Sequence, residues 1–404
     1  MTIRMDEGAA ELLDTLHRAG YAAYVVGGCV RDSLLGLTPH DWDLCTSALP
    51  QQVMELFGAQ RCIPTGLQHG TVTVKQSGAL YEITTFRTEG TYTDGRHPDE
   101  VHFVPDVRED LARRDLTINA MAYNEIEGLV DPFGGQADLQ SGIVRAVGVP
   151  RQRFTEDALR ILRLYRFAAR FGFAIDPPTA QAAQELCAHL DCVSVERIEE
   201  ELAKLLSAPA PAAYLDKKIL FVILPELSSE ALAAAKPVVD ACPAGEQALP
   251  VRLAALLLSL GEDGTRRTLR RLRCSNACIE ETAVLVREVV SGVPVSLNIY
   301  ARRLLGKYNL CTVQRLAALG TALQPERSAD FAALSELAEQ LDTDGVCCRV
   351  SQLAVNGCDL MAAGVPAGPG IRKVLEALLD GVIREEYPNE RQALLAAVQQ
   401  LAAS

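Results

Sequence analysis

The sequence predicts an α+β protein in which a mixed α/β head is followed by a long, helical remainder. Short β-branched runs separated by turn residues are concentrated in about the first 140 residues. Beyond Glu156, Leu, Ala, Glu and Arg recur at helical spacing and strand-like alternation becomes rare. Since single domains usually hold about 100–200 residues, a chain of 404 residues is expected to form several packing units.

The predicted elements follow one another in a regular order. The first is an amphipathic helix from Glu7 to Ala19. Strands are predicted at Tyr24–Val26, Trp42–Cys45, Gly70–Lys75, Tyr81–Phe86 and Val101–Phe103. Clusters of Pro, Gly and small residues predict breaks near Pro150, at 208–211, at 243–245 and near Gly345.

Composition narrows the class of protein. A hydrophobic content of 49% with 23% charged residues is typical of a compact globular chain. The acidic N-terminus has no apolar core of a signal peptide, and the apolar stretch 249–260 is short and interrupted by Arg252, so we expect a cytoplasmic protein without membrane contact. The 12 cysteines form no CxxC pair, which favours reduced, mostly buried thiols.

Charge is unevenly distributed along the chain. The net charge of −13 argues against a general nucleic-acid coat protein, because contacts to phosphates need Lys and Arg. However, six arginines lie between Arg151 and Arg170, and five lie between Thr265 and Arg273. Each stripe is either a local phosphate-binding surface or a solvated helix face.

A glycine pair marks the first candidate binding feature. An apolar strand runs into Gly27 and Gly28, and a helix is predicted to open near Val30 and Arg31. Paired glycines let backbone amides approach a phosphate, a helix N-terminus favours an anion, and Arg31 adds a counter-charge. A simple tight turn is the alternative.

Two aspartates follow in the sequence His40-Asp41-Trp42-Asp43-Leu44. On a strand, Asp41 and Asp43 share one face while Trp42 and Leu44 point into the core. Adjacent carboxylates repel each other, so the pair indicates a hard cation with oxygen ligands, above all Mg²⁺. Two solvated acids at the end of a strand are the alternative.

A third acid lies on a later predicted strand, in Tyr81-Glu82-Ile83-Thr84. Glu82 alternates with the apolar residues and could complete a two-metal cage that activates a 3′-hydroxyl and steadies a leaving pyrophosphate. Alone, it would also fit a surface acid. Further on, Arg113 and Arg114 offer forked donors to a triphosphate, and Asp115 and Asn119 could contact a ribose, unless Asp115 only caps a short helix.

In this order, these motifs resemble the head of the class II tRNA nucleotidyltransferases and bacterial poly(A) polymerases. The resemblance continues in Glu156-Asp157-Ala158-Leu159-Arg160, which matches the family's EDxxR element, in LRLYRFAARFGF, and in Val195–Glu201. Residues 20–205 carry these motifs, whereas the second half matches in helical character and in looser pieces such as LRRLRCSN and LAVNGCDLMAAG. The resemblance implies a polymerase-β-like head at 1–140, a neck at 141–206, a body at 207–340 and a tRNA-binding tail at 341–404.

The resemblance also implies a role for each matching residue. Asp41 and Asp43 would bind Mg²⁺, with Glu82 as the third catalytic acid. The triphosphate would be held by Gly28, Arg31 and Arg114, and the ribose or triphosphate by Asp115 and Asn119. The incoming base would be read by Asp157 and Arg160, in a pocket lined by Arg163 and Arg166.

Base reading by an acid and an arginine also has a physical basis. Cytosine and adenine both present an amino donor beside a ring-nitrogen acceptor, whereas uracil and guanine present a carbonyl oxygen and a ring N–H. On a helix, Asp157 and Arg160 would be neighbours, and Glu156 at i+4 from Arg160 could orient the guanidinium. A buried mismatch costs about 1–3 kcal/mol, so two mismatches would reject UTP and GTP without a nucleic-acid template. An ordinary helix start with an ion pair is the alternative.

Within this family the sequence favours an enzyme that adds C, C and A to tRNA from CTP and ATP. The polar segment from Arg87 to Asp99 is similar to the mobile loop of full CCA-adding enzymes, and Arg266–Arg273 is a candidate tRNA surface. A poly(A) polymerase or a partial CC- or A-adding enzyme remains the close alternative. A small-molecule nucleotidyltransferase and a non-catalytic RNA-binding relative are more distant ones, and the sequence does not determine the oligomeric state.

Overall fold

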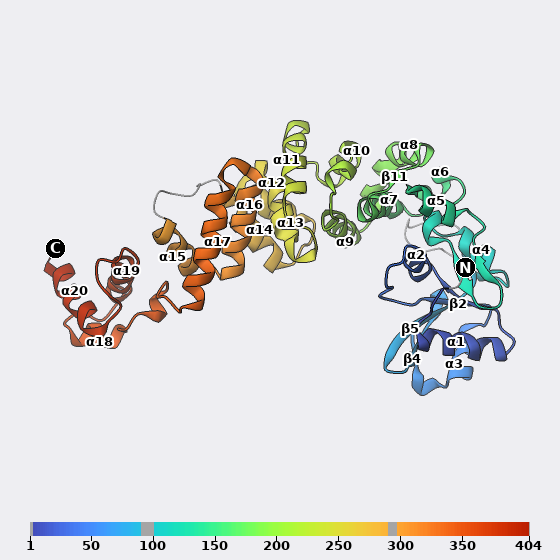
Figure 1. Ribbon diagram of the computed structural model, residues 1–404, viewed down its shortest axis with the longest axis horizontal. Helices are drawn as coiled ribbons and strands as arrows, with labels where there is room; N and C mark the ends of the chain where they lie inside the picture. The colour runs from blue at the N-terminus through green and yellow to red at the C-terminus, as the bar shows by residue number, and fades with distance from the viewer. Residues whose placement is uncertain (1–2, 90–100, 290–296, 404) are drawn as a thin grey trace. The chain divides into compact units, whose positions relative to one another are not determined.

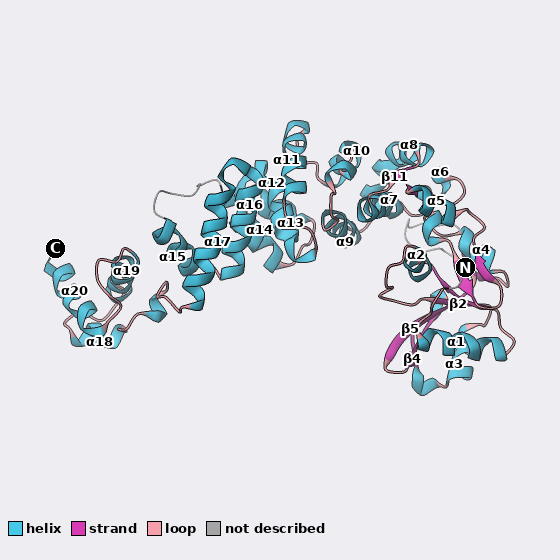
Figure 2. Cartoon of the chain, viewed as in Figure 1, coloured by secondary structure: helices cyan, strands magenta, loops and turns pink. Residues whose placement is uncertain are grey.

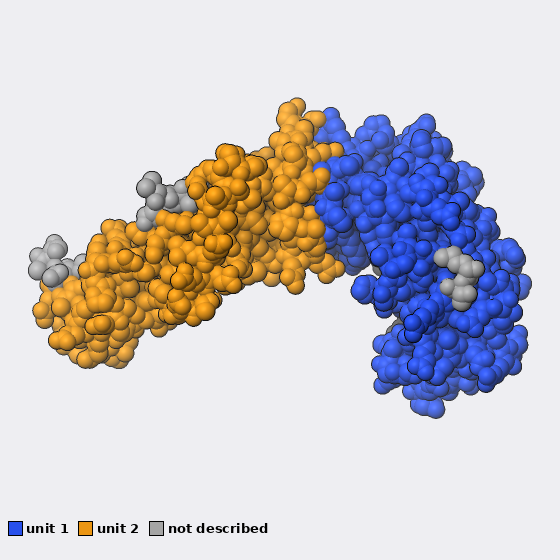
Figure 3. All heavy atoms as spheres, in the orientation of Figure 1, with its two compact units in different colours: residues 1–226 blue, residues 227–404 orange. Residues whose placement is uncertain are grey.

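A computed structural model describes residues 3–89, 101–289 and 297–403 of the chain. The chain divides into two compact units, Met1–Glu226 and Leu227–Ser404 (Figure 3). Most of the segment between Arg87 and Asp99, for which the sequence predicts a mobile loop, lies outside the described residues.

The first unit contains all the described strands and the helices α1 to α10 (Figures 1 and 2). The strands are β1 (Ala23–Val26), β2 (Leu44–Thr46), β3 (Cys62–Gly66), β4 (Thr71–Gln76), β5 (Ala79–Thr85), β6 (Arg87–Glu89), β7 (Val101–Phe103), β8 (Ala122–Asn124), β9 (Gly128–Val130), β10 (Ile143–Val144) and β11 (Ala174–Ile175). The helices are α1 (Glu7–Arg18), α2 (Gly28–Leu34), α3 (Pro50–Phe57), α4 (Val107–Ala112), α5 (Gly135–Ser141), α6 (Pro150–Glu156), α7 (Leu159–Phe171), α8 (Pro177–Leu186), α9 (Val195–Leu206) and α10 (Lys217–Ile223).

A seven-stranded sheet in the order β3-β4-β5-β2-β1-β8-β9 forms the centre of the head. The β2–β5 pair is parallel and the others are antiparallel. Since side chains alternate between the faces, the buried residues Val25, Leu44 and Ile83 share one face, where α1 and α3 pack. Glu82 therefore lies on the other face, near the core cluster around Phe86 and Leu111.

The predicted neck, residues 141–206, contains α6 to α9 and the short β10–β11 pair, and α10 follows it within the first unit. α7 carries a buried apolar stripe that includes Leu162 and Phe167, while arginines recur every three or four residues along it. α9 packs against α7 and buries Ile198, Leu202 and Leu205. Glu201 lies in the same buried stripe of α9.

The second unit is helical throughout its described part. Its helices are α11 (Ser229–Ala241), α12 (Leu249–Leu257), α13 (Gly261–Arg271), α14 (Asn276–Val289), α15 (Leu297–Lys307), α16 (Leu310–Leu323), α17 (Ser328–Thr343), α18 (Gly357–Ala362), α19 (Gly370–Ile383) and α20 (Arg391–Ala403). α12, α14 and α16 pack on one another, and α17 lies against α16. No helix in the described ranges is long and apolar enough to cross a membrane.

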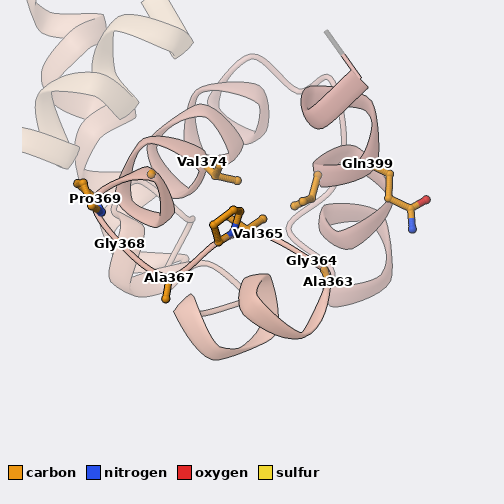
Figure 4. A pocket seen from close by; sticks show the side chains of 11 residues that line it. Ala363, Gly364, Val365, Ala367, Gly368, Pro369, Val374 and Gln399 are labelled. Carbon is orange, nitrogen blue, oxygen red and sulfur yellow. The ribbon is translucent and has the colours of Figure 1, made fainter.

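The last three helices enclose their own small core around Leu360, Leu378 and Leu394. Beside this core lies a cavity of about 620 Å³ (Figure 4). The loop 363–370 lines it, together with Val374, Val398 and Gln399.

Several sequence predictions are confirmed and others are corrected. The predicted helix 7–19 is α1, and strands β1, β4 and β5 lie where they were expected. The strand predicted at Trp42–Cys45 begins later, at Leu44, and Val101–Phe103 pairs with β6 in a separate hairpin. Half of the 12 cysteines are buried, fewer than predicted, and Cys192, Cys311 and Cys358 are exposed.

Candidate active site

The glycine pair forms the predicted turn between β1 and α2. Gly27 has a φ of +79°, which L side chains rarely adopt, and its N–H donates to the Met121 carbonyl at 3.0 Å. A Cβ atom on Gly27 would lie 3.0 Å from Nη1 of Arg114. Glycine at this position therefore lets the Arg114 guanidinium approach the backbone.

The two aspartates lie on the extended segment that leads into β2. The carbonyl of Asp43 accepts a hydrogen bond from Val26 N–H at 2.9 Å, which fixes this residue at the end of the sheet. Asp41 and Asp43 are both exposed. Contrary to the prediction, Trp42 does not enter the core, because the ladder of β2 starts only at Leu44; its partly buried ring lines the same cleft as the acids.

Glu82 joins the aspartates through strand register. Leu44 pairs with Ile83 in the parallel β2–β5 ladder, so the preceding residues Asp43 and Glu82 lie side by side. All three acids line one cleft of about 640 Å³. The structure thus brings together the three carboxylates that the sequence predicts.

The acids of this cleft carry little compensating charge. Although the Asp43 side chain reaches solvent, the surrounding protein atoms partly desolvate it, and this desolvation, together with the Glu82 and Asp41 carboxylates, raises its pKa, while Arg114 partly opposes the shift. In the described part of the chain, none of the three acids forms an ion pair, and no three ligating side chains are close enough to hold a metal ion as they stand. The donor set of carboxylate oxygens nevertheless suits a hard divalent cation.

Arg31 is not free to bind a triphosphate in this structure. Its side chain is only 3% exposed and forms an ion pair with Asp32 at 2.7 Å. The guanidinium also donates to Oδ1 of Asn119 and lies 5.0 Å from the ring centroids of both Phe167 and Phe171. These contacts join α2 to Asn119 and α7, and the direct contact of Arg31 with a triphosphate stays a prediction.

Arg114 is better placed for a phosphate. Within the described residues it forms one ion pair, with Asp110 at 3.4 Å, and Asp110 also binds Arg113 at 2.8 Å. Asp110 is fully buried, and although burial by itself would raise its pKa, the charges of Arg114 and Arg113 hold that pKa below its ordinary value. The sequence analysis missed this acid, although its spacing of three and four residues from the arginines is the usual spacing of helical ion pairs.

Asp115 and Asn119 are both buried and bonded to each other at 3.2 Å. Arg163 of α7 reaches Asp115 with Nε at 2.7 Å and Nη2 at 2.6 Å. Burial alone would raise the pKa of Asp115, but Arg163 and the hydrogen bond from Asn119 lower it to about 2. The short 3₁₀ helix Thr117–Asn119 is capped by Leu116, so Asp115 does not act as its N-cap.

Asp157 and Arg160, the predicted base readers, occupy the junction of α6 and α7. Asp157 is not helical, with φ −143° and ψ 105°, and its carboxylate accepts from Leu159 N–H at 3.0 Å. The prediction that both residues share a helix is therefore wrong, because this bond starts a new helix after Asp157. The predicted i, i+4 pair is present, with Arg160 Nη1 at 2.6 Å from Glu156.

Helix α9 supplies two partners that the sequence analysis did not assign. Arg197 binds Asp157 at 2.7 Å, and Glu201 lies 2.6 Å from Arg166 and 3.9 Å from Arg163. Glu201 was detectable as an acid within an apolar stripe, since such an acid usually has a buried partner. Arg163 and Arg166 both lie over the ring of Phe167.

The acid cleft and the α6–α7 junction are connected through two consecutive residues. The charge of Arg114 acts on Asp43, while the carbonyl of Arg113 accepts from Arg160 at 3.0 Å. Among the described residues, Arg114 Nε and Arg197 Nη1 are buried without a hydrogen-bond partner.

Convergent carboxylates beside unsatisfied arginines, on a mixed sheet followed by helices, define a nucleotidyltransferase. Comparison with known proteins agrees with this class. The family model described as the poly A polymerase head domain matches residues 23–145, and that of the RNA- and SrmB-binding site of polymerase A matches residues 172–230. A model of tRNA nucleotidyltransferase domain 2 matches residues 251–398.

Relatives that match nearly the whole chain indicate which kind of nucleotidyltransferase it is. The CCA-adding enzyme of Lactiplantibacillus plantarum is 37% identical over 96% of this chain and 95% of that protein. The CCA-adding enzyme of Limosilactobacillus fermentum is 38% identical over 98% of this chain and 97% of that protein. The crystal structure of the Bacillus stearothermophilus CCA-adding enzyme in complex with CTP has a TM-score of 0.84 and 31% identity, over 99% of this chain and 98% of that chain. The chain belongs to the family of CCA-adding enzymes.

Proposed function

We propose that this enzyme completes the 3′ end of tRNA by adding C, C and A from CTP and ATP, with release of pyrophosphate. The observation that carries the proposal is the acid cleft and the α6–α7 junction in one unit, within a chain similar over nearly its full length to CCA-adding enzymes. A small-molecule nucleotidyltransferase would leave the junction and the long helical part without a role.

The catalytic centre in this proposal consists of Asp41, Asp43 and Glu82. Asp41 and Asp43 would hold Mg²⁺, with Glu82 as the third acid, because the three carboxylates line one cleft and because desolvation, followed by the charges of Glu82 and Asp41, raises the pKa of Asp43. Bound divalent ions would lower the pKa of the attacking 3′-hydroxyl and stabilise the charge on the pyrophosphate. The protein contributes by fixing Asp43 on the sheet and Glu82 beside it.

The triphosphate would lie along Gly28 and Arg114. Arg114 has a buried Nε without a partner and only one weak ion pair, so it has donors to offer to phosphate oxygens. Arg31 would act indirectly by holding Asn119, and Asp115 with Asn119 would contact the ribose when the Arg163 pair rearranges.

Base selection would depend on Asp157 and Arg160, with Arg163 and Arg166 beside them. The Asp157 carboxylate accepts and the Arg160 guanidinium donates hydrogen bonds. This pair of groups is complementary to the edges of cytosine and adenine and mismatched to those of uracil and guanine. Arg197 and Glu156 hold the two readers, so their hydrogen-bonding edges are fixed before a nucleotide arrives. Because the protein itself presents the pattern, no nucleic-acid template is needed.

The tRNA would contact the second unit. Arg267 and Arg270 of α13 are exposed, and the tail at 341–404 carries its own core and cavity. We also propose a cytoplasmic location, which the free state of all 12 cysteines supports.

Three nucleotide mixtures test the function. A tRNA transcript without its CCA end would be incubated with CTP alone, ATP alone or both, and the products resolved at single-nucleotide length. We expect two additions with CTP alone, none with ATP alone and three with both. Long tails from ATP alone on arbitrary RNA would identify a poly(A) polymerase instead, and two additions from the full mixture would identify a CC-adding enzyme.

A further inference from the structure

The acid cleft also has an apolar wall, which binding of a cation by the acids does not require. Across β3, β4 and β5, Ile63 pairs with Thr73, and Thr73 pairs with Glu82. These three side chains therefore form a row on one face of the sheet, and the row continues to Asp43 through the β5–β2 register. Leu80 precedes Glu82 by two residues and lies on the same face.

This wall exposes apolar side chains beside carboxylates. Leu80 is 62% exposed and Ile63 is 43% exposed, and both line the cleft together with Trp42. The opposite face of these strands is buried, with Val72, Val74 and Ile83 in the core. The exposed apolar residues thus belong to the cleft and do not support the fold.

We propose that Ile63, Leu80 and Trp42 form the binding wall for the 3′-terminal nucleotide of the RNA that is being extended. This inference rests on the proposed function and deepens it. The wall would pack against the base of that nucleotide and place its 3′-hydroxyl at the acids.

Two arguments select this occupant over the incoming nucleotide. The hydroxyl that attacks must lie at the acids, so the nucleotide that carries it must lie within the same cleft, whose volume of about 640 Å³ is ample for one nucleotide. Asp157 and Arg160, which would read the incoming base, do not line this cleft. We therefore assign the apolar wall to the other reactant, the RNA whose 3′ end is extended.

The chemistry of the wall also fits a terminus that changes during the reaction. The terminal nucleotide differs before the first addition and after each cytidine. A wall of hydrogen-bonding groups would reject some of these ends, whereas apolar contact accepts every base because every base has an apolar face. An apolar wall is what repeated addition at one site requires.

Trp42 provides the readout, because it is the only tryptophan in the chain. A tRNA minihelix without CCA would be titrated into the enzyme in EDTA without nucleotide, with Trp42 fluorescence as the signal. A second minihelix would carry an abasic 3′-terminal residue. We expect the abasic RNA to bind the wild type about tenfold more weakly and to cause less quenching.

The variants Leu80→Ser and Ile63→Ser test whether these two residues form the binding wall. Both side chains are exposed, so we expect the variants to fold. Each should weaken binding of the intact minihelix about tenfold and leave the abasic one unchanged, with an unchanged KM for CTP. Ile126→Ser is the matched control, because Ile126 is 74% exposed and does not line the cleft.

Equal binding of the two RNAs to the wild type would overturn the proposal, as would an equal loss for both RNAs in the variants. The assay with three nucleotide mixtures tests the proposed function independently of the fluorescence titration. If the wild type adds no nucleotide to RNA, the proposed function fails whatever the fluorescence shows.

Discussion

At the residue scale, the head contains acids in two kinds of environment. Asp41, Asp43 and Glu82 repel one another and, in the described chain, form no ion pair, whereas Asp110 and Asp115 are buried among arginines. The first group is suited to a cation and the second to positioning arginines. Substitutions should therefore affect turnover in the first group and stability in the second.

Asp43→Asn should abolish most of the turnover while leaving the fold intact. Loss of one ligand charge removes several kcal/mol of transition-state stabilisation, so we expect kcat to fall at least about 100-fold. Single-turnover addition of CTP measures this effect, and circular dichroism checks the fold. Glu55→Gln on α3, an exposed acid, is the control, and turnover near the wild-type level in Asp43→Asn would refute the assignment.

Asp115 should make the stability of the protein depend on acid pH. Its pKa is about 2 in the folded chain and about 3.9 when unfolded, so its contribution is fully present above pH 4 and is lost as the pH falls toward 2. This difference of about two pKa units corresponds to about 3 kcal/mol, since one pKa unit is about 1.4 kcal/mol. Asp115→Asn should therefore be less stable than the wild type at pH 6, with a gap that closes near pH 2 in urea unfolding. A gap that is constant with pH would contradict this.

At the element scale, the α7–α9 pair organises the site. α7 presents Arg163 and Arg166, and α9 supplies Glu201 to both and Arg197 to Asp157. Helical periodicity predicted each helix, because an amphipathic stripe is a local property. It did not predict the end of α6 at Glu156, because the bond from Leu159 N–H to Asp157 and the ion pair with Arg197 favour a non-helical Asp157.

Two adjacent glutamates of α9 test this organisation. Glu201 is 5% exposed beside two arginines, whereas the exposed Glu200 lies 3.9 Å from Lys204. Glu201→Gln should lower the free energy of unfolding by about 3 kcal/mol, because it leaves a buried guanidinium without its counter-charge. Glu200→Gln should change it by less than about 0.5 kcal/mol. Chemical unfolding followed by circular dichroism measures both, and equal effects would mean that the buried pair does not hold α9 to α7.

At the scale of the whole molecule, the arginines of an acidic protein are concentrated on particular helices. The net charge is −13, yet arginines recur on α7 and α13. On α7 most of them have carboxylate partners, whereas Arg267 and Arg270 of α13 are exposed and form no ion pair among the described residues. We expect the α13 arginines to contribute to tRNA binding.

Reversal of this charge gives a direct test. The double variant Arg267→Glu with Arg270→Glu should raise the KM for tRNA about tenfold at low salt, with an unchanged KM for CTP. The difference should shrink as ionic strength increases, because salt screens exposed charges. Arg18→Glu on α1 is the matched control, since Arg18 is exposed and lies in the head. An unchanged KM for tRNA in the double variant would remove α13 from the RNA surface.

The sequence alone determined the class of fold and the order of head and helices, and it singled out the three acids that line one cleft, because alternation, helical spacing and short motifs are read from neighbouring residues. Only the tertiary structure decided what those residues touch. It buried Arg31 between Asp32 and two phenylalanines, tied Asp157 to Arg197 forty residues away, and placed Ile63 and Leu80 beside the acids. These contacts depend on strand register and on how helices pack, which no local pattern specifies.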